Sequence, residues 1–118
     1  MKLILIVDDE IDITETFSLL FEVHGFETLT ASNGSEALTL LENRIPDLII
    51  SDCMMPVMDG VAFRKKVEEN RLLEAVPFIL MSAAPEQHDL ASVRIDGFLK
   101  KPFHFDELID KVRALLAD

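Results

Sequence analysis

Short apolar runs alternate along the chain with longer segments in which apolar residues recur every three or four positions. The runs have the length of β-strands, and the longer segments have the period of amphipathic α-helices. Strands are expected at five places that share this apolar character, within residues 3–7, 26–31, 48–50, 78–81 and 98–99. A helix-forming stretch follows each run, so strand and helix alternate almost to the end of the chain.

Capping residues and glycines mark where the helices begin and end. The first helix ends near Gly25, and its apolar face consists of Ile13, Phe17, Leu20 and Phe21. The second begins at Asn33, with Glu36 three residues later as in a capping box, and Asp59 can cap the third. Residues 85–92 predict a weak helix at best. The last helix has the clearest apolar stripe, made of Phe105, Leu108, Ile109, Val112, Leu115 and Leu116.

Five strand-then-helix units with short connections predict an α/β fold, because consecutive parallel strands are joined by helical crossovers. Helices cover both faces of such a sheet. A chain of 118 residues is long enough for one core of this kind and too short for two. We therefore expect residues 1–118 to form a single domain.

The charge of the chain narrows the choice of partners. Its formal net charge of −11 disfavours direct binding to nucleic acid or to anionic membranes, and favours metal cations and basic protein surfaces. The apolar runs are far shorter than a membrane span, and the N-terminus has no signal-peptide layout, so a cytoplasmic location is expected. Cys53 is the only cysteine, which excludes an internal disulfide.

Acidic residues follow two of the predicted strands. Asp8 and Asp9 come directly after the first strand, and Asp52 closes the third. In an open parallel sheet, ligands bind beyond the carboxyl ends of the strands, where the strand order reverses. If the first and third strands are neighbours there, the three carboxylates converge and need a cation, for which Mg²⁺ is the best match. Asp8 and Asp9 alone would be interpreted as helix-capping residues; Asp52 at the matching strand end favours a metal site.

Two further polar groups follow the last two strands. Ser82 comes after the fourth strand and Lys101 after the fifth. A hydroxyl and a cation beside a metal-binding carboxylate cluster describe a site for a tetrahedral anion. Carboxylates can act as nucleophiles toward phosphorus, which would give an aspartyl-phosphate. Singly, Ser82 would be a strand-end cap and Lys101 a solvated lysine, so the prediction depends on their joint placement.

Four motifs, in order and at compatible spacing, resemble those of the receiver domains of response regulators in two-component systems. They are Ile6-Val7-Asp8-Asp9-Glu10, the stretch from Asp52 through Met54-Met55-Pro56 to Asp59-Gly60, Met81-Ser82-Ala83, and Lys101-Pro102-Phe103. The resemblance covers essentially the whole chain. It implies a doubly wound, flavodoxin-like sheet with the strand order 2-1-3-4-5.

The resemblance also implies a role for each acidic residue. Asp52 would be the phosphoacceptor. Asp9 would bind Mg²⁺ directly, Asp8 at least through water, and the backbone carbonyl of Met54 would complete the protein's share of the coordination. Met54 and Ala84 would flank the path by which water reaches the phosphorylated aspartate, and neither side chain can polarise a water molecule.

For the remaining motif residues, the resemblance implies contacts with the phosphoryl group and a switch. Ser82 would donate a hydrogen bond to the phosphoryl group, assisted by the Ala83 backbone N–H, and Lys101 would pair with the phosphate. The peptide bond before Pro102 would be cis. Phe98 stands where the family has its switch aromatic.

One departure from the family pattern lies between Ser82 and Lys101. This stretch is several residues shorter than usual and lacks the Ala- and Gly-Ala-containing pattern that normally precedes the fifth strand. The fourth helix is therefore expected to be short or irregular, and the surface that receivers use for output to differ here.

The expected function is a phosphorylation-dependent signalling switch rather than an enzyme that turns over metabolites. Its partners would be a sensor histidine kinase or a histidine phosphotransfer protein, and a downstream output domain or protein. Two alternatives remain open at this point. One is a Mg²⁺-dependent phosphohydrolase with Asp8 as nucleophile, and the other is an interaction module that keeps the receiver fold without being phosphorylated.

Overall fold

A computed structural model describes residues 1–117 as five strands and four α-helices in alternation. The strands are β1 (Leu3–Val7), β2 (Glu27–Ala31), β3 (Leu48–Asp52), β4 (Phe78–Ser82) and β5 (Gly97–Lys100). The helices are α1 (Ile11–Val23), α2 (Gly34–Leu41), α3 (Gly60–Glu68) and α4 (Phe105–Leu116). None of these helices is long and apolar enough to cross a membrane.

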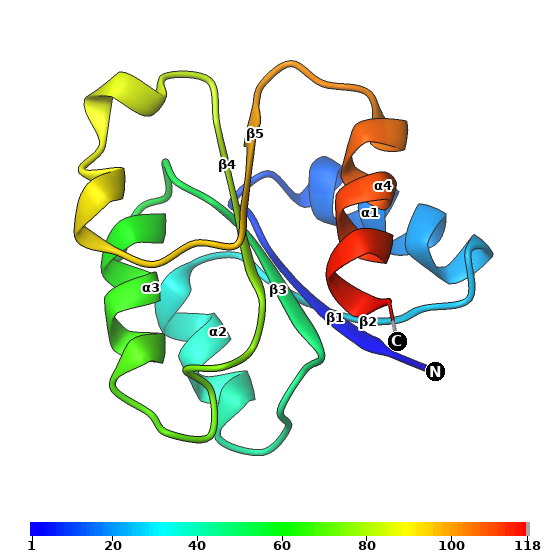
Figure 1. Cartoon of the computed structure of the whole chain (residues 1–118), viewed down its shortest axis with the longest axis horizontal. Coiled ribbons are helices and arrows are strands. Elements are labelled where there is room, and N and C mark those ends of the chain that lie inside the picture. The colour runs from blue at the N-terminus through cyan, green and yellow to red at the C-terminus, as the bar shows by residue number, and fades with distance from the viewer. Residues whose placement is uncertain (118) are drawn as a thin grey trace.

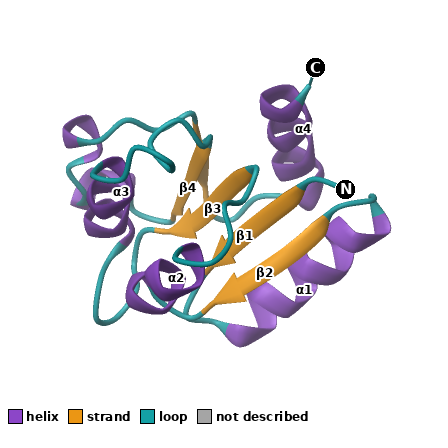
Figure 2. Cartoon of the chain, turned by 90° about the horizontal axis from the view of Figure 1, so that it is seen from below, coloured by secondary structure: helices purple, strands orange, loops and turns teal. Residues whose placement is uncertain are grey.

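The five strands form one parallel sheet in the order β2-β1-β3-β4-β5, which confirms the expected fold class. Figure 1 shows α2 and α3 on one side of the sheet and α1 and α4 on the other, and the view from below in Figure 2 shows the same layers. β1 lies next to β3 with Val7 paired to Ser51. The strand order reverses at this pair, so the residues that follow β1 and β3 meet at one edge of the sheet.

Each face of the sheet has its own apolar core, because alternate residues of a strand point to opposite faces. Leu5, Ile49 and Leu80 face α2 and α3, whereas Ile4 and Ile50 face α1 and α4. The central strands β1, β3 and β4 are buried along their whole length. Such burial on both faces is why these strands are nearly continuous apolar runs.

The first turns of α2 and α3 are capped by the residues that the sequence indicates. The Asn33 side chain accepts a hydrogen bond from the Glu36 N–H at 2.8 Å, and the Glu36 carboxylate accepts from Ser32 in return. The Asp59 carboxylate accepts from the Ala62 N–H at 2.8 Å at the start of α3. Gly60 lets this helix start close against β3, because a Cβ there would lie 2.9 Å from Cα of Cys53.

The expected irregular fourth helix is confirmed. Between β4 and β5 the chain forms only two 3₁₀ turns, η1 (Pro85–Gln87) and η2 (Leu90–Ser92), and neither contains a buried residue. The segment runs beside α3 in Figure 1, in yellow-green and yellow. The physical reason is that it lacks an apolar stripe, so there is no packing energy to stabilise a helix of this length.

Candidate functional site

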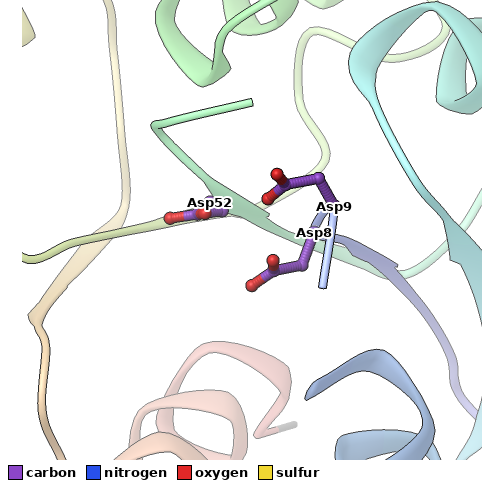
Figure 3. Close-up of side chains that lie close together, drawn as sticks. All are labelled: Asp8, Asp9 and Asp52. Carbon is purple, nitrogen blue, oxygen red and sulfur yellow. The ribbon is translucent and has the colours of Figure 1, made fainter. Parts of the chain in front are cut away.

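Three carboxylates meet where β1 and β3 end. Asp8 and Asp9 follow β1, Asp52 is the last residue of β3, and one oxygen from each lies within 4.8 Å of the others. Figure 3 shows these side chains close together at the ends of the two strands. Asp8 and Asp52 are buried, whereas Asp9 is exposed. An all-oxygen ligand set with one side open to water fits a hard divalent cation such as Mg²⁺.

Lys101 supplies a positive charge to this cluster from the end of β5. Its Nζ atom lies 3.4 Å from Oδ2 of Asp8 and 3.2 Å from Oδ1 of Asp52. The Lys101 backbone N–H donates to the carbonyl of Ser82 at 2.9 Å, which ties this position to the end of β4. The peptide bond between Lys101 and Pro102 is cis.

Burial has the largest effect on the pKa values of the buried groups in the cluster, and neighbouring charges modify it. Burial raises the pKa of Asp8 and of Asp52 because it disfavours the ionised form. The nearby negative charges add to the increase, and Lys101 opposes it. Burial alone would lower the pKa of Lys101, but the two carboxylates raise it above its ordinary value. The cluster is therefore short of positive charge even with Lys101 in place.

Ser82 and Phe98 lie near the cluster but do not join it in this structure. Ser82 is buried at the end of β4, and its hydroxyl oxygen accepts a hydrogen bond from the Ala84 N–H at 3.0 Å. Phe98 pairs with Leu80 across β4 and β5 and packs half-buried against the core on the α2–α3 side. The structure thus brings together Asp8, Asp9, Asp52 and Lys101.

A hollow of about 420 Å³ adjoins the carboxylates on the α3 side. It is lined by Asp9, Cys53, Met54, Met55, Pro56, Asp59 and His88. The Met54 side chain is exposed. His88 comes from the segment between β4 and β5, and nothing in the sequence pattern placed it there. Burial raises the pKa of the Cys53 thiol to about 11, so this cysteine is a poor nucleophile at neutral pH.

Comparison with protein families decides what this arrangement represents. Residues 4–113 match the sequence model of the response regulator receiver domain. The chain belongs to the response regulator receiver family. The match includes both strand ends that carry the carboxylates and the fifth-strand end that carries Lys101.

Similar proteins support the same assignment. Response regulator SaeR of Staphylococcus aureus is 36% identical over 98% of this chain, and the chain spans about half (51%) of the length of that relative. Chemotaxis response regulator CheY4 of Vibrio cholerae is 34% identical with a TM-score of 0.91, covering 98% of this chain and 99% of CheY4. Response regulator TrrA of Thermotoga maritima, solved in complex with Mg²⁺ and BeF, is 37% identical with a TM-score of 0.88, covering 98% of this chain and all (100%) of TrrA.

Proposed function

We propose that this receiver accepts a phosphoryl group on Asp52 from a phosphohistidine, in a Mg²⁺-dependent step, and acts as a signalling switch. The convergence of Asp8, Asp9 and Asp52 with Lys101 at one sheet edge carries the proposal. TrrA has also been solved in complex with the histidine kinase ThkA, and it is 36% identical to this chain in that structure. The phosphodonor proposed here is accordingly a sensor histidine kinase or a histidine phosphotransfer protein.

The proposed reaction uses few protein groups. A carboxylate oxygen of Asp52 forms the new bond to phosphorus as the bond from phosphorus to the donor imidazole breaks, and the imidazole nitrogen retains the electron pair and takes a proton from solvent. Lys101 shifts from the carboxylates to a phosphoryl oxygen, and the Ser82 hydroxyl donates a hydrogen bond to another. Mg²⁺, held by Asp8, Asp9, Asp52 and the carbonyl of Met54, would neutralise charge on the phosphoryl oxygens.

We favour Asp52 over Asp8 as the nucleophile, and hence a receiver over a phosphohydrolase: Lys101 lies against both carboxylates, but the Glu10 N–H also donates to Asp8. Both oxygens of Asp8 have partners: Oδ1 accepts from the Glu10 N–H at 3.0 Å, and Oδ2 lies 3.4 Å from Lys101. The backbone hydrogen bond from Glu10 restrains the Asp8 carboxylate in addition to the lysine that the two carboxylates share. We therefore assign Asp8 to metal binding.

The output of the switch is a further part of the proposal. Phe98 lies on β5 beside β4, whose last residue is Ser82. Movement of Ser82 toward the phosphoryl group would let Phe98 turn, and this change would be read by an output domain or protein. We propose residues 1–118 as one receiver domain. The chain spans about half the length of the curated relatives it matches.

Labelling with a small phosphodonor tests the proposal. Acetyl phosphate with Mg²⁺ should add one phosphoryl group to the wild-type chain, as seen by intact-protein mass spectrometry. Asp52→Asn should remove the label, whereas Asp110→Asn, an exposed change on α4, should leave it in place. Full labelling of Asp52→Asn would assign the nucleophile to another residue, and an unlabelled wild type would support the unphosphorylated interaction module.

A further inference from the structure

The segment between β4 and β5 has little core of its own. Residues 83–93 contain the turns η1 and η2, in which no residue is buried. Leu90 is half-buried against the core on the α2–α3 side, and Val93 is buried next to the end of the segment. The position of this segment therefore depends strongly on how its two ends are held.

The first end is held by a hydrogen bond between neutral groups. The Ala84 N–H donates to the hydroxyl oxygen of Ser82 at 3.0 Å. This is the hydroxyl that would turn toward a phosphoryl group on Asp52. If the side chain rotates to reach that group, the Ala84 N–H loses its acceptor.

The second end is held by a pair of charged side chains on α3. The Arg94 N–H donates to Oε1 of Glu68 at 2.9 Å, and the Arg94 carbonyl accepts from Nε of Arg64 at 2.6 Å. Nε of Arg64 also lies 3.3 Å from Oε1 of Glu68. Both backbone groups of Arg94 are thus bound by one ion pair, which we call the Arg94 clamp (Arg64, Glu68 and the backbone of Arg94).

The guanidinium of the clamp is shielded from solvent in the folded chain. Arg64 is completely buried, and its guanidinium carbon lies 5.0 Å from the centre of the Phe78 ring. Nη1 of Arg64 is one of two buried side-chain nitrogens within residues 1–117 that have no hydrogen-bond partner. Losing the bond to the Arg94 carbonyl would leave Nε of Arg64 with only its longer contact to Glu68, at 3.3 Å, which weakens the pairing of a buried charged donor.

Beyond Arg94 the chain is fixed to β4. The Asp96 carboxylate accepts from the Phe78 N–H, and the Asp96 N–H donates to the Phe78 carbonyl, both at 2.8 Å. β5 follows directly, with Gly97 paired to Ile79. The clamp therefore lies at the boundary between a weakly packed segment and a strand in register.

We propose that residues 83–93 form a strap with one releasable end at Ser82 and one fixed end at the Arg94 clamp. The trigger rests on the proposed function: the phosphoryl group on Asp52 takes the Ser82 hydroxyl and frees Ala84. The clamp stays closed because the bond from Arg64 to the Arg94 carbonyl is part-buried and comes from a charged donor, and such hydrogen bonds are stronger than neutral ones. The bond from the Arg94 N–H to Glu68 is exposed and adds less. The strap then moves about Arg94 while β5 keeps its register.

The two ends have separate reporters in amide hydrogen exchange, because each reporting N–H donates to a side chain of the protein. In Ser82→Ala the Ala84 amide should exchange faster, by about threefold to tenfold, and the Arg94 amide should exchange at the wild-type rate. Phosphorylation of the wild type should reproduce this pattern. Acceleration at Ala84 and Arg94 by the same factor would overturn the strap, since it would mean that the segment opens as a whole.

Variants of the clamp test its fixed end. Glu68→Gln keeps the size and an acceptor oxygen but removes the charge, and because the bond to the Arg94 N–H is exposed it should speed exchange at Arg94 by about threefold. Glu69→Gln is the matched control, because Glu69 directly follows α3 and its side chain makes an exposed ion pair with Lys66. If the two variants exchange alike at Arg94, the clamp does not hold the strap.

The trigger and the strap fail in distinguishable ways. A wild-type chain that gains no phosphoryl mass with acetyl phosphate and Mg²⁺ refutes the trigger together with the proposed function. The strap itself is judged on Ser82→Ala and Glu68→Gln, which require no phosphorylation. Phosphorylation that occurs on Asp52 without a change at Ala84 refutes the trigger alone.

Discussion

Nζ of Lys101 lies 3.2 Å from Oδ1 of Asp52, although Lys101 follows β5, Asp52 ends β3, and β4 separates these two strands in the sheet. The lysine side chain thus reaches across the end of β4. Its ammonium group pairs with two buried carboxylates, because Oδ2 of Asp8 also lies 3.4 Å away. A phosphoryl group on Asp52 would compete with the carboxylates for this ammonium group.

The carboxylate cluster should lower the stability of the fold at neutral pH. Burial raises the pKa of Asp52 above its value in the unfolded chain, so the folded state holds this proton more tightly and stability falls as pH rises through the folded-state pKa. Asp52→Asn should raise the free energy of unfolding at pH 7, on the order of 1 kcal/mol. Urea denaturation should show this gain shrinking below that pKa. A gain that is the same at pH 7 and in acid would contradict the electrostatic cause.

Mg²⁺ binding should require the exposed and the buried carboxylate together. Titration calorimetry should give weak, reversible binding for the wild type and a loss of at least about tenfold for Asp9→Asn and for Asp52→Asn, since each removes a charged oxygen ligand. Asp110→Asn changes the net charge equally at an exposed position on α4 and should bind as the wild type does. Equal Mg²⁺ affinities in all four proteins would refute the assignment of the metal site.

The loop between β3 and α3 contains a residue with backbone strain that a substitution can remove. Val57 has φ of 71° and is 83% exposed, and the Met58 N–H donates to the Pro56 carbonyl across it at 2.7 Å. A β-branched residue rarely adopts this conformation. Val57→Gly should therefore raise the free energy of unfolding by about 0.5–1 kcal/mol, after allowing for the greater freedom of glycine in the unfolded chain.

Val23→Gly is the control for this change. Val23 is equally accessible, at 81% exposure, but lies at the end of α1, where glycine should destabilise by up to about 1 kcal/mol. Thermal unfolding of both variants should shift the melting temperature in opposite directions. A loss of stability in both would mean that Val57 is not strained.

The aspartyl-phosphate is expected to be long-lived. Hydrolysis needs a water molecule held in line with the bond from Asp52 to phosphorus, and orienting such a nucleophile is much of what phosphoryl-transfer catalysts do. Met54 lies exposed beside the carboxylates, and neither it nor Ala84 can orient water. Met54→Asn and Ala84→Glu should each speed the loss of phosphate, followed by mass spectrometry. Unchanged decay in both would show that these residues do not set the lifetime.

Local features of the fold could be predicted from the sequence because their causes are local. The Asn33–Glu36 capping box and the Asp59 cap depend on residues three positions apart, and the apolar stripe of α4 depends on the helical period. Asp52 could be placed beside Asp8 for a similar reason, since both end parallel strands. The reversal of strand order between β1 and β3 was implied by the family resemblance rather than by the pattern itself.

The tertiary structure alone decided which distant residues meet. No period in the sequence connects Arg64 with Arg94, and an arginine on an amphipathic helix is ordinarily solvated, yet Arg64 is completely buried between α3, the ring of Phe78 and the backbone of Arg94. The same holds for His88, which reaches the hollow beside Asp9 from an irregular segment. Hydrophobic periodicity records which face of an element is buried. The path of a segment without periodicity is determined only by the surfaces and hydrogen-bonding groups that the rest of the folded chain presents to it.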